Sequence, residues 1–175
     1  PKYEDYAREM VTPAKADSAF DTDLPMYQLF TGIDDPAFYR VDTQYAPTVA
    51  NTRDRVRDNA SLALNYRGVR TSKSILDNDI YSFYLKNHIR NINNGCEIGS
   101  FDERAALLSM AGVKYYSALD YANIPIPYGY EKIADDQEGH SLYQNKYHLG
   151  IGYVYSDYML ELDADALHPV ARQFA

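Results

Sequence analysis

The chain has little of the chemistry that depends on sulfur or on indole. Its 175 residues include no tryptophan and one cysteine, Cys96. A single cysteine cannot form an intramolecular disulfide or a thiolate metal cluster. No histidine stands beside Cys96 in the sequence, so we interpret it as a buried or incidental thiol rather than as a nucleophile.

The sequence also lacks the marks of a membrane span and of a secretion signal. No stretch approaches the run of about 20 apolar residues that a transmembrane helix needs, and no signal peptide is recognisable at the start. The first residue is Pro1 rather than methionine. We therefore expect the chain to be an excised part of a longer protein whose membrane segments lie elsewhere.

Positive charge is scarce. The chain has 17 lysines and arginines against 25 acidic residues, a formal net charge of -8, and such a field repels the phosphates of nucleic acids. One dense basic group occurs, at Arg53, Arg55 and Arg57, and Asp54 and Asp58 interrupt it. We interpret this group as a solvated segment of mixed charge and predict no nucleic-acid partner.

Motifs for phosphate binding, nucleophilic catalysis and metal ligation are missing as well. His140 and His148 could meet across a hairpin, and Asp135, Asp136 and Glu138 could form a weak calcium site. We favour a solvated hairpin tip for the acidic group, because paired acids are frequent in turns. The sequence therefore predicts no catalytic residue, no metal and no cofactor in this chain.

What the chain does contain is tyrosine. It has 18 tyrosines, and 46% of its residues are hydrophobic, which allows a chain of this length a sizeable core. Tyrosine combines an apolar ring with a polar hydroxyl and suits strands, wet interfaces and sugar-stacking surfaces. We favour a tyrosine-rich sheet over a sugar-stacking surface.

The hydrophobic pattern predicts the elements of the first two thirds of the chain. Alternation of apolar and polar residues predicts strands over residues 38–43 and 61–69, and residues 91–99 are predicted to be a turn-rich break. Helical spacing predicts a helix over residues 76–90. A second helix is predicted over residues 102–111, with Asp102 and Glu103 in its first turn and Gly112 as its left-handed stop, followed by a strand over residues 113–119.

The last third is predicted to be mostly sheet. Strands are expected over residues 130–134, 141–143 and 150–158, and a short helix over residues 163–174. This order predicts an α+β fold: a single domain with a mostly antiparallel or mixed sheet and two to four helices. We expect residues 1–36 to be a lead-in segment and residues 37–175 to be the domain.

Several motifs occur in order and resemble a known family. They are FYRV at 38–41, NYRGVRTS at 65–72, ALL at 106–108 with GVKYY at 112–116, and YQN at 143–145 with LGIGY at 149–153. This pattern resembles the extracytoplasmic region of the YfhO family of bacterial membrane proteins, over about residues 37–158. The family pattern has LLGVKY where this chain reads SMAGVKYY, and YEN where it reads YQN.

The resemblance implies a function. Such proteins resemble polytopic membrane glycosyltransferases that move a sugar from undecaprenyl phosphate to lipoteichoic acid or related cell-wall polymers in Gram-positive bacteria. Their catalytic carboxylates lie in loops of the membrane part, so no catalytic residue is carried over to this chain. We expect an accessory domain on the extracytoplasmic side of the cell membrane, with the transmembrane part of the same polypeptide as partner, and possible contact with a cell-wall polymer or a lipid-linked sugar.

Two alternatives stay open. The chain could be a non-catalytic binding or structural module on the cell surface, unconnected with sugar transfer. It could also be a free-standing carbohydrate enzyme, which would need two carboxylates facing each other across a cleft.

The candidate binding residues are Tyr66, Arg67 and Arg70, which surround Gly68. Arginine can pair with a polymer phosphate and tyrosine can stack on a sugar, and a glycine lets a ligand approach the backbone. The competing interpretation is a structural turn with Ser72 or Ser74 as a helix cap. We interpret a further group as structural, with Lys114, Tyr115 and Tyr116 packing a strand and Asn145 holding a hairpin turn.

Overall fold

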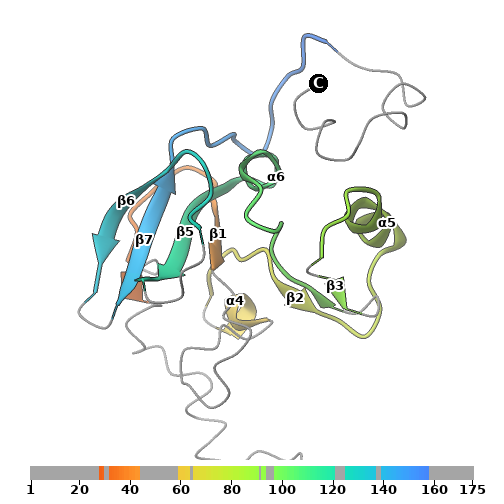
Figure 1. Ribbon diagram of the computed structural model, residues 1–175, viewed down its shortest axis with the longest axis horizontal. Helices are drawn as coiled ribbons and strands as arrows, with labels where there is room; N and C mark the ends of the chain where they lie inside the picture. The colour runs from red at the N-terminus through yellow and green to blue at the C-terminus, as the bar shows by residue number, and fades with distance from the viewer. Residues whose placement is uncertain are drawn as a thin grey trace, which may run out of the picture.

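The computed structural model describes residues 28–29, 32–43, 59–63, 65–90, 92–93, 97–120, 125–136 and 139–157. These residues form two β-sheets and three helices (Figure 1). In chain order the elements are β1 (Arg40–Thr43), α4 (Ala60–Ala63), β2 (Thr71–Ser72), α5 (Asn78–Lys86), β3 (Ile92–Asn93), β4 (Glu97–Ile98), α6 (Ala105–Met110), β5 (Val113–Leu119), β6 (Tyr130–Asp135) and β7 (His140–Asn145).

The larger sheet has the strand order β1-β5-β7-β6. β1 pairs with β5 in parallel, and β5, β7 and β6 pair antiparallel. The smaller sheet is antiparallel, with the order β2-β4-β3. A mixed sheet with three helices confirms the predicted α+β class.

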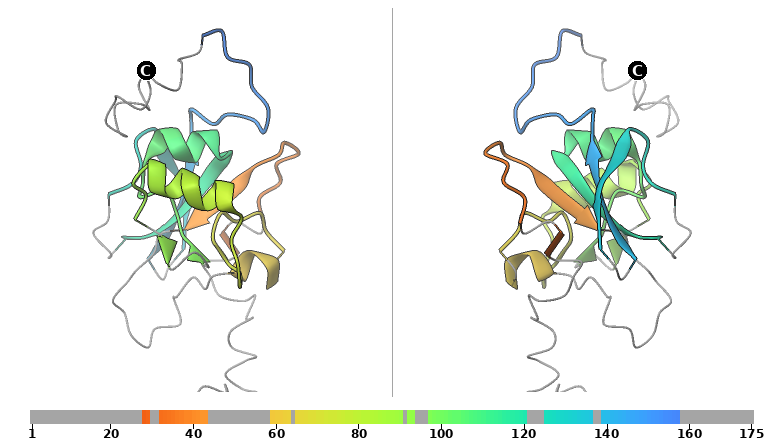
Figure 2. Two further views of the ribbon diagram at one scale, coloured as in Figure 1. Left: turned by 90° about the vertical axis from the view of Figure 1, so that its right-hand side faces the viewer. Right: turned by 90° about the vertical axis from the view of Figure 1, so that its left-hand side faces the viewer.

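The main core lies between the large sheet and α5 and α6. β5 is buried along almost its whole length, and its alternating side chains point to opposite faces. Tyr116 and Ala118 join the core beside Leu107 and Leu108 of α6, whereas Tyr115 belongs to a smaller cluster with other partners. The views of Figure 2 show α5 and α6 on the same side of the large sheet.

Both long predicted helices are present, in shorter form. α5 begins after Asp77, whose side chain accepts a hydrogen bond from the amide of Asp79, which satisfies one of the free donors at the helix start. α6 ends before Gly112, whose φ of +73° is the predicted left-handed stop. Asp102 and Glu103 precede α6 and have positive φ, so their placement in its first turn was wrong.

The predicted strand over residues 61–69 was wrong. Residues 60–63 form the short helix α4, and Asn65 has a φ of 55°, which breaks an extended chain. Leu62, one of the alternating apolar residues, is 80% exposed. The segment reaches the large sheet at one point, a parallel bridge between Gly68 and Val41.

Two other predictions differ from the structure. Residues 150–157 form no strand, and Val154 is 97% exposed, because no neighbouring strand pairs with this glycine-containing segment. Within the predicted break at 91–99, β3 and β4 pair as short strands. The predicted helix over residues 163–174 lies outside the described residues.

The lead-in segment and its boundary stay a prediction, since most of residues 1–31 fall outside the described ranges. Ile33 and Asp35, near its end, nevertheless pack on the large sheet.

Of the helices described, none combines the length and the apolar character needed to cross a bilayer.

Candidate functional site

The candidate residues lie in the connection between α4 and β2, which runs beside the first strand of the large sheet. The amide of Val41 donates to the carbonyl of Arg67 at 2.8 Å. A Cβ at Gly68 would lie 2.7 Å from Cβ of Ser61 and 3.1 Å from the ring of Tyr66. A glycine is therefore required here by the close approach of α4.

Arg70 and Asp42 form a buried pair. Nε of Arg70 lies 3.5 Å from Oδ1 of Asp42, with 8% and 0% of the side chains exposed. Arg70 also donates to the carbonyl of Thr43 at 2.6 Å, and Asp42 accepts from the hydroxyl of Ser100 and from the amide of Thr43. Burial raises the pKa of Asp42, and the Arg70 charge opposes that rise. Arg70 therefore fixes the connection to β1.

Arg67 differs from Arg70, because it is exposed. Its guanidinium carbon lies 5.2 Å from the centroid of the Phe38 ring and 5.8 Å from that of Tyr39. The guanidinium carbon of Arg40 lies 5.3 Å from the same Phe38 ring. The two arginines are thus held near one another by aromatic faces, whose negative quadrupole attracts cations.

Neither of these two guanidinium groups forms an ion pair with a carboxylate in the described part of the chain. The guanidinium group of Arg40 donates a hydrogen bond to the carbonyl of Ala111. These two arginines, which pair with no acid among the described residues, add positive charge locally to a chain with a net charge of -8. We call Phe38, Arg40 and Arg67 the arginine–aromatic cluster.

Tyr66, which precedes Arg67, is half-buried. It packs against the smaller core cluster, beside Tyr39 and Val41. Its amide donates to the carbonyl of Ser61 at 3.0 Å. Of the three predicted residues, the structure therefore places Arg67 over Phe38, packs Tyr66 against the smaller core cluster and engages Arg70 with Asp42.

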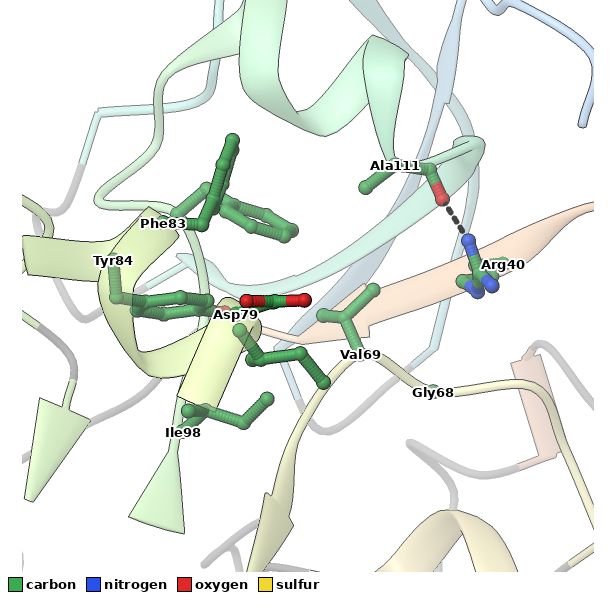
Figure 3. A pocket seen from close by; sticks show the side chains of 10 residues that line it. Arg40, Gly68, Val69, Asp79, Phe83, Tyr84, Ile98 and Ala111 are labelled. Atoms are coloured by element: carbon green, nitrogen blue, oxygen red, sulfur yellow. Dashed lines mark hydrogen bonds between the residues drawn. The ribbon is translucent and has the colours of Figure 1, made fainter. Parts of the chain in front are cut away.

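A pocket of about 450 Å³ has Gly68 in its lining. Figure 3 shows Arg40 beside Ala111 at one side of it and the α5 residues Phe83 and Tyr84 at the other. The lining is mostly apolar and consists of Val69, Ile80, Phe83, Tyr84, Ile98, Phe101 and Ala111, with Gly68, Arg40 and Asp79. Arg40 is thus shared by the pocket and the arginine–aromatic cluster.

The pocket combines an apolar wall with one cation and one anion. Asp79 is the one carboxylate among the described residues that line it. Glycoside chemistry commonly uses two carboxylates that flank the reacting bond. The described lining therefore offers a binding surface with a cationic end, and it places no pair of acids across the pocket.

A second charged group joins the start of β5 to Asp35. Lys114 and the hydroxyl of Tyr115 both donate to Oδ2 of Asp35. The hydrogen bond from Lys114, with that from the amide of Ala37, lowers the pKa of Asp35 to about 2. Burial and the bond to Asp35 raise the pKa of Tyr115 to about 12. These contacts, and Tyr116 with none of its surface exposed, confirm the interpretation of residues 114–116 as strand packing.

The possible metal sites do not assemble. His140 is the first residue of β7 and His148 follows its last residue, so the length of the strand separates them. Asp135 pairs with Lys132, and Asp136 accepts from the ring and the amide of His140. Glu138 lies outside the described residues, and in the part that is described no three potential ligands lie close enough to hold a metal ion.

Asn145 ends β7 and holds a turn, but no described strand follows that turn, so the predicted hairpin is not formed. Its Oδ1 accepts from the amide of Tyr147 at 2.9 Å, and its amide nitrogen donates to Ser109 and to the carbonyl of Val113. This side chain thereby ties the turn to α6 and β5. Cys96 and the basic group at residues 53–57 lie outside the described residues.

Sequence reasoning missed two members of the site, Phe38 and Arg40. Both belong to the FYRV motif, which was used for the resemblance and as a strand. The dipeptide Tyr-Arg occurs in both FYRV and NYRGVR, as Tyr39-Arg40 and Tyr66-Arg67. This repeat was the signal available in the sequence. That the two motifs lie side by side depends on the bridge between Val41 and Gly68, which no local pattern reveals.

The comparisons with known proteins give one match. A family model described as "Bacterial membrane protein YfhO" matches residues 10–175. No curated protein and no solved structure matches the chain.

Proposed function

Since the chain belongs to the YfhO family of bacterial membrane proteins, we propose that it forms an extracytoplasmic domain of a membrane glycosyltransferase-like protein. In this proposal the chain is an accessory to sugar transfer and catalyses no step itself. It binds and positions the acceptor, a lipoteichoic acid or related cell-wall polymer, while the membrane part of the polypeptide transfers the sugar from undecaprenyl phosphate.

The observation that carries the proposal is the shared Phe38 ring under Arg40 and Arg67, at 5.3 and 5.2 Å. Teichoic acids repeat phosphodiesters and carry sugars. Guanidinium groups suit the phosphates, because their forked donors match two phosphate oxygens. Aromatic rings suit the apolar faces of the sugars.

The pocket supports the same proposal. It continues from Arg40 along an apolar wall that includes Val69 and Phe83. A ligand whose phosphate lies on the cluster can extend a less polar unit into this pocket. Tyr66 anchors the connection on the smaller core cluster, and Arg70 positions it through Asp42 without contacting the ligand.

A titration of the 175-residue chain with purified teichoic-acid fragments tests the proposal. Calorimetry should show binding that weakens as salt rises, because exposed charges are screened. Arg67→Ala should weaken it about tenfold, the lower range for one charge-assisted hydrogen bond, and Arg67→Lys should recover part of the loss. Lys132→Ala removes the same charge away from the site and should leave the affinity unchanged.

Equal affinities for the native chain and the Arg67→Ala variant would contradict the proposed site. A neutral glucose oligomer is the second probe and should bind more weakly than the phosphate-containing fragments. In the full-length membrane protein, Arg67→Ala should raise KM for the acceptor with little change in kcat. If fragment binding were lost and transfer unchanged, the chain would be a surface-binding module instead.

A further inference from the structure

An exposed apolar segment follows the large sheet. Residues 149–155 read LGIGYVY, and the stretch between His148 and Asp157 has no charged side chain. Ile151 is 70% exposed, Val154 97% and Tyr155 67%. Figure 2 shows this stretch, in blue, extending beyond the sheet and the helices in both views.

Two tyrosines on the neighbouring turns adjoin the start of this segment. The rings of Tyr128 and Tyr147 stack with centroids 5.8 Å apart, and 77% and 51% of these residues are exposed. The ring of Tyr147 lies against Gly129, where a Cβ would be 2.4 Å from it. Within the segment, Tyr153 and Tyr155 meet edge to face at 5.2 Å. The exposed surface is therefore apolar and aromatic together.

A surface of this kind requires an explanation in physical terms. Single exposed apolar residues are ordinary, but a contiguous group marks a surface that another apolar phase covers. Here the group lies in a segment with no regular structure, in which a Cβ at Gly152 would meet no atom within 4 Å.

We propose that residues 149–155, with Tyr128 and Tyr147, dock into the interfacial region of a lipid bilayer. Tyrosine is enriched at that depth, where its ring meets acyl chains and its hydroxyl meets headgroups and water. An irregular backbone fits the interface, because water and headgroups there satisfy its polar groups, whereas the hydrocarbon interior would not. The absence of carboxylates from 149 to 156 spares this part of an acidic chain the repulsion of anionic headgroups.

Membership of a membrane-protein family associates the protein with a bilayer, which is the occupant that we propose for this surface. The segment also starts at the end of the large sheet where Arg40 begins β1. The amide of Arg40 donates to the carbonyl of Gly112, and the side chain of Asn145, at the end of β7, donates to the carbonyl of Val113. Docking would thus hold the arginine–aromatic cluster close to the membrane surface, although the docking itself does not require that the cluster bind an acceptor.

The chain has no tryptophan, so a single introduced tryptophan reports its own surroundings. We would place it in Val154→Trp and, as a matched control, in Ile75→Trp, which is 83% exposed outside the segment. With phosphatidylcholine vesicles, the emission of Val154→Trp should shift to the blue and should be quenched when the acyl chains are brominated. Ile75→Trp should keep its emission in water.

A second measurement uses no tryptophan. The native chain should sediment together with the same vesicles. In the double variant Ile151→Asp with Val154→Asp, the fraction of protein that sediments with them should be about tenfold smaller. Leu62→Asp, at an 80% exposed position elsewhere, should leave it unchanged. All of these positions are exposed, so circular dichroism should show the native fold in each variant.

Water-like emission of Val154→Trp in the presence of vesicles, or equal sedimentation of the native chain and the double aspartate variant, would overturn the proposal. A blue shift that rises with protein concentration in the absence of lipid would show self-association instead, and would overturn it as well.

Discussion

Asp42 and Arg70 join two segments that are 28 positions apart in the sequence inside the domain, with Nε and Oδ1 3.5 Å apart. The pair connects β1 to the stretch just before β2, and Thr43 and Ser100 supply further hydrogen bonds. This buried pair fixes the path of the connection that presents Arg67 at the surface.

Breaking this pair should destabilise the fold strongly. Arg70→Met leaves the Asp42 carboxylate buried without its cation, and such losses cost about 3–5 kcal/mol. Urea denaturation should show this decrease in the free energy of unfolding. Combining Arg70→Met with Asp42→Asn removes both charges and should cost less than the sum of the two single changes. Additive effects would contradict a direct coupling.

Arg67→Ala removes an exposed arginine and is the control for the removal of the buried Arg70. Arg67 is exposed and contacts the faces of Phe38 and Tyr39, and cation–π contacts at exposed sites contribute about 0.5–1 kcal/mol. The free energy of unfolding should therefore fall by no more than about 1 kcal/mol. A loss as large as that of Arg70→Met would mean that Arg67 is a structural residue rather than a binding residue.

The core prediction concerns Leu108 of α6, which has none of its surface exposed. Leu108→Ala removes buried methyl groups between α6 and the large sheet and should cost about 2–5 kcal/mol. Leu62→Ala makes the same chemical change at an 80% exposed position and should be nearly neutral. Similar midpoints for both variants in urea would contradict the position of α6 in the core.

Gly68 should not tolerate a side chain. In Gly68→Ala the new Cβ would lie 2.7 Å from Cβ of Ser61, a contact that requires α4 or the connection to move. We expect a loss of about 1–3 kcal/mol in the free energy of unfolding. Adding Ser61→Gly should recover part of it, and no recovery would place the clash elsewhere.

The pH dependence of stability should include Asp35. Its folded pKa is lowered to about 2, below the usual 3.8, by Lys114 and the amide of Ala37. A depressed pKa contributes stability that is fully present above the unfolded value and is lost as pH falls through the folded value. Thermal unfolding between pH 5 and pH 2 should therefore show a smaller decrease in Asp35→Asn than in the native chain. Identical slopes would contradict the contact with Lys114.

The sequence predicted the elements whose signals are local. Gly112 ends a run of helical spacing, and residues 113–119 were predicted as the strand that leaves this helix, so α6 and β5 are both present, with α6 shorter than predicted. The prediction of a strand over residues 61–69 was wrong, because alternation alone does not create a partner strand. Asn65 and Gly68 instead bend this stretch around α4.

The candidate site was predicted only in part, because some of its members are identified by residue type and others by contacts between distant segments. Arg67 and Tyr66 stand out in the sequence through their residue types. Whether an arginine faces solvent or a buried acid depends on a residue as distant as Asp42, and no local pattern separates Arg67 from Arg70. The approach of both guanidinium groups to the Phe38 ring follows from the pairing of β1 with the connection.

The most direct test of the account is a map of backbone amide shifts by nuclear magnetic resonance during titration with teichoic-acid fragments. The account predicts saturable shifts at the amides of Phe38, Arg40, Arg67 and Gly68, and their loss in Arg67→Ala while the rest of the spectrum is retained. Shifts confined to another face of the domain, or no shifts at saturating fragment, would contradict it.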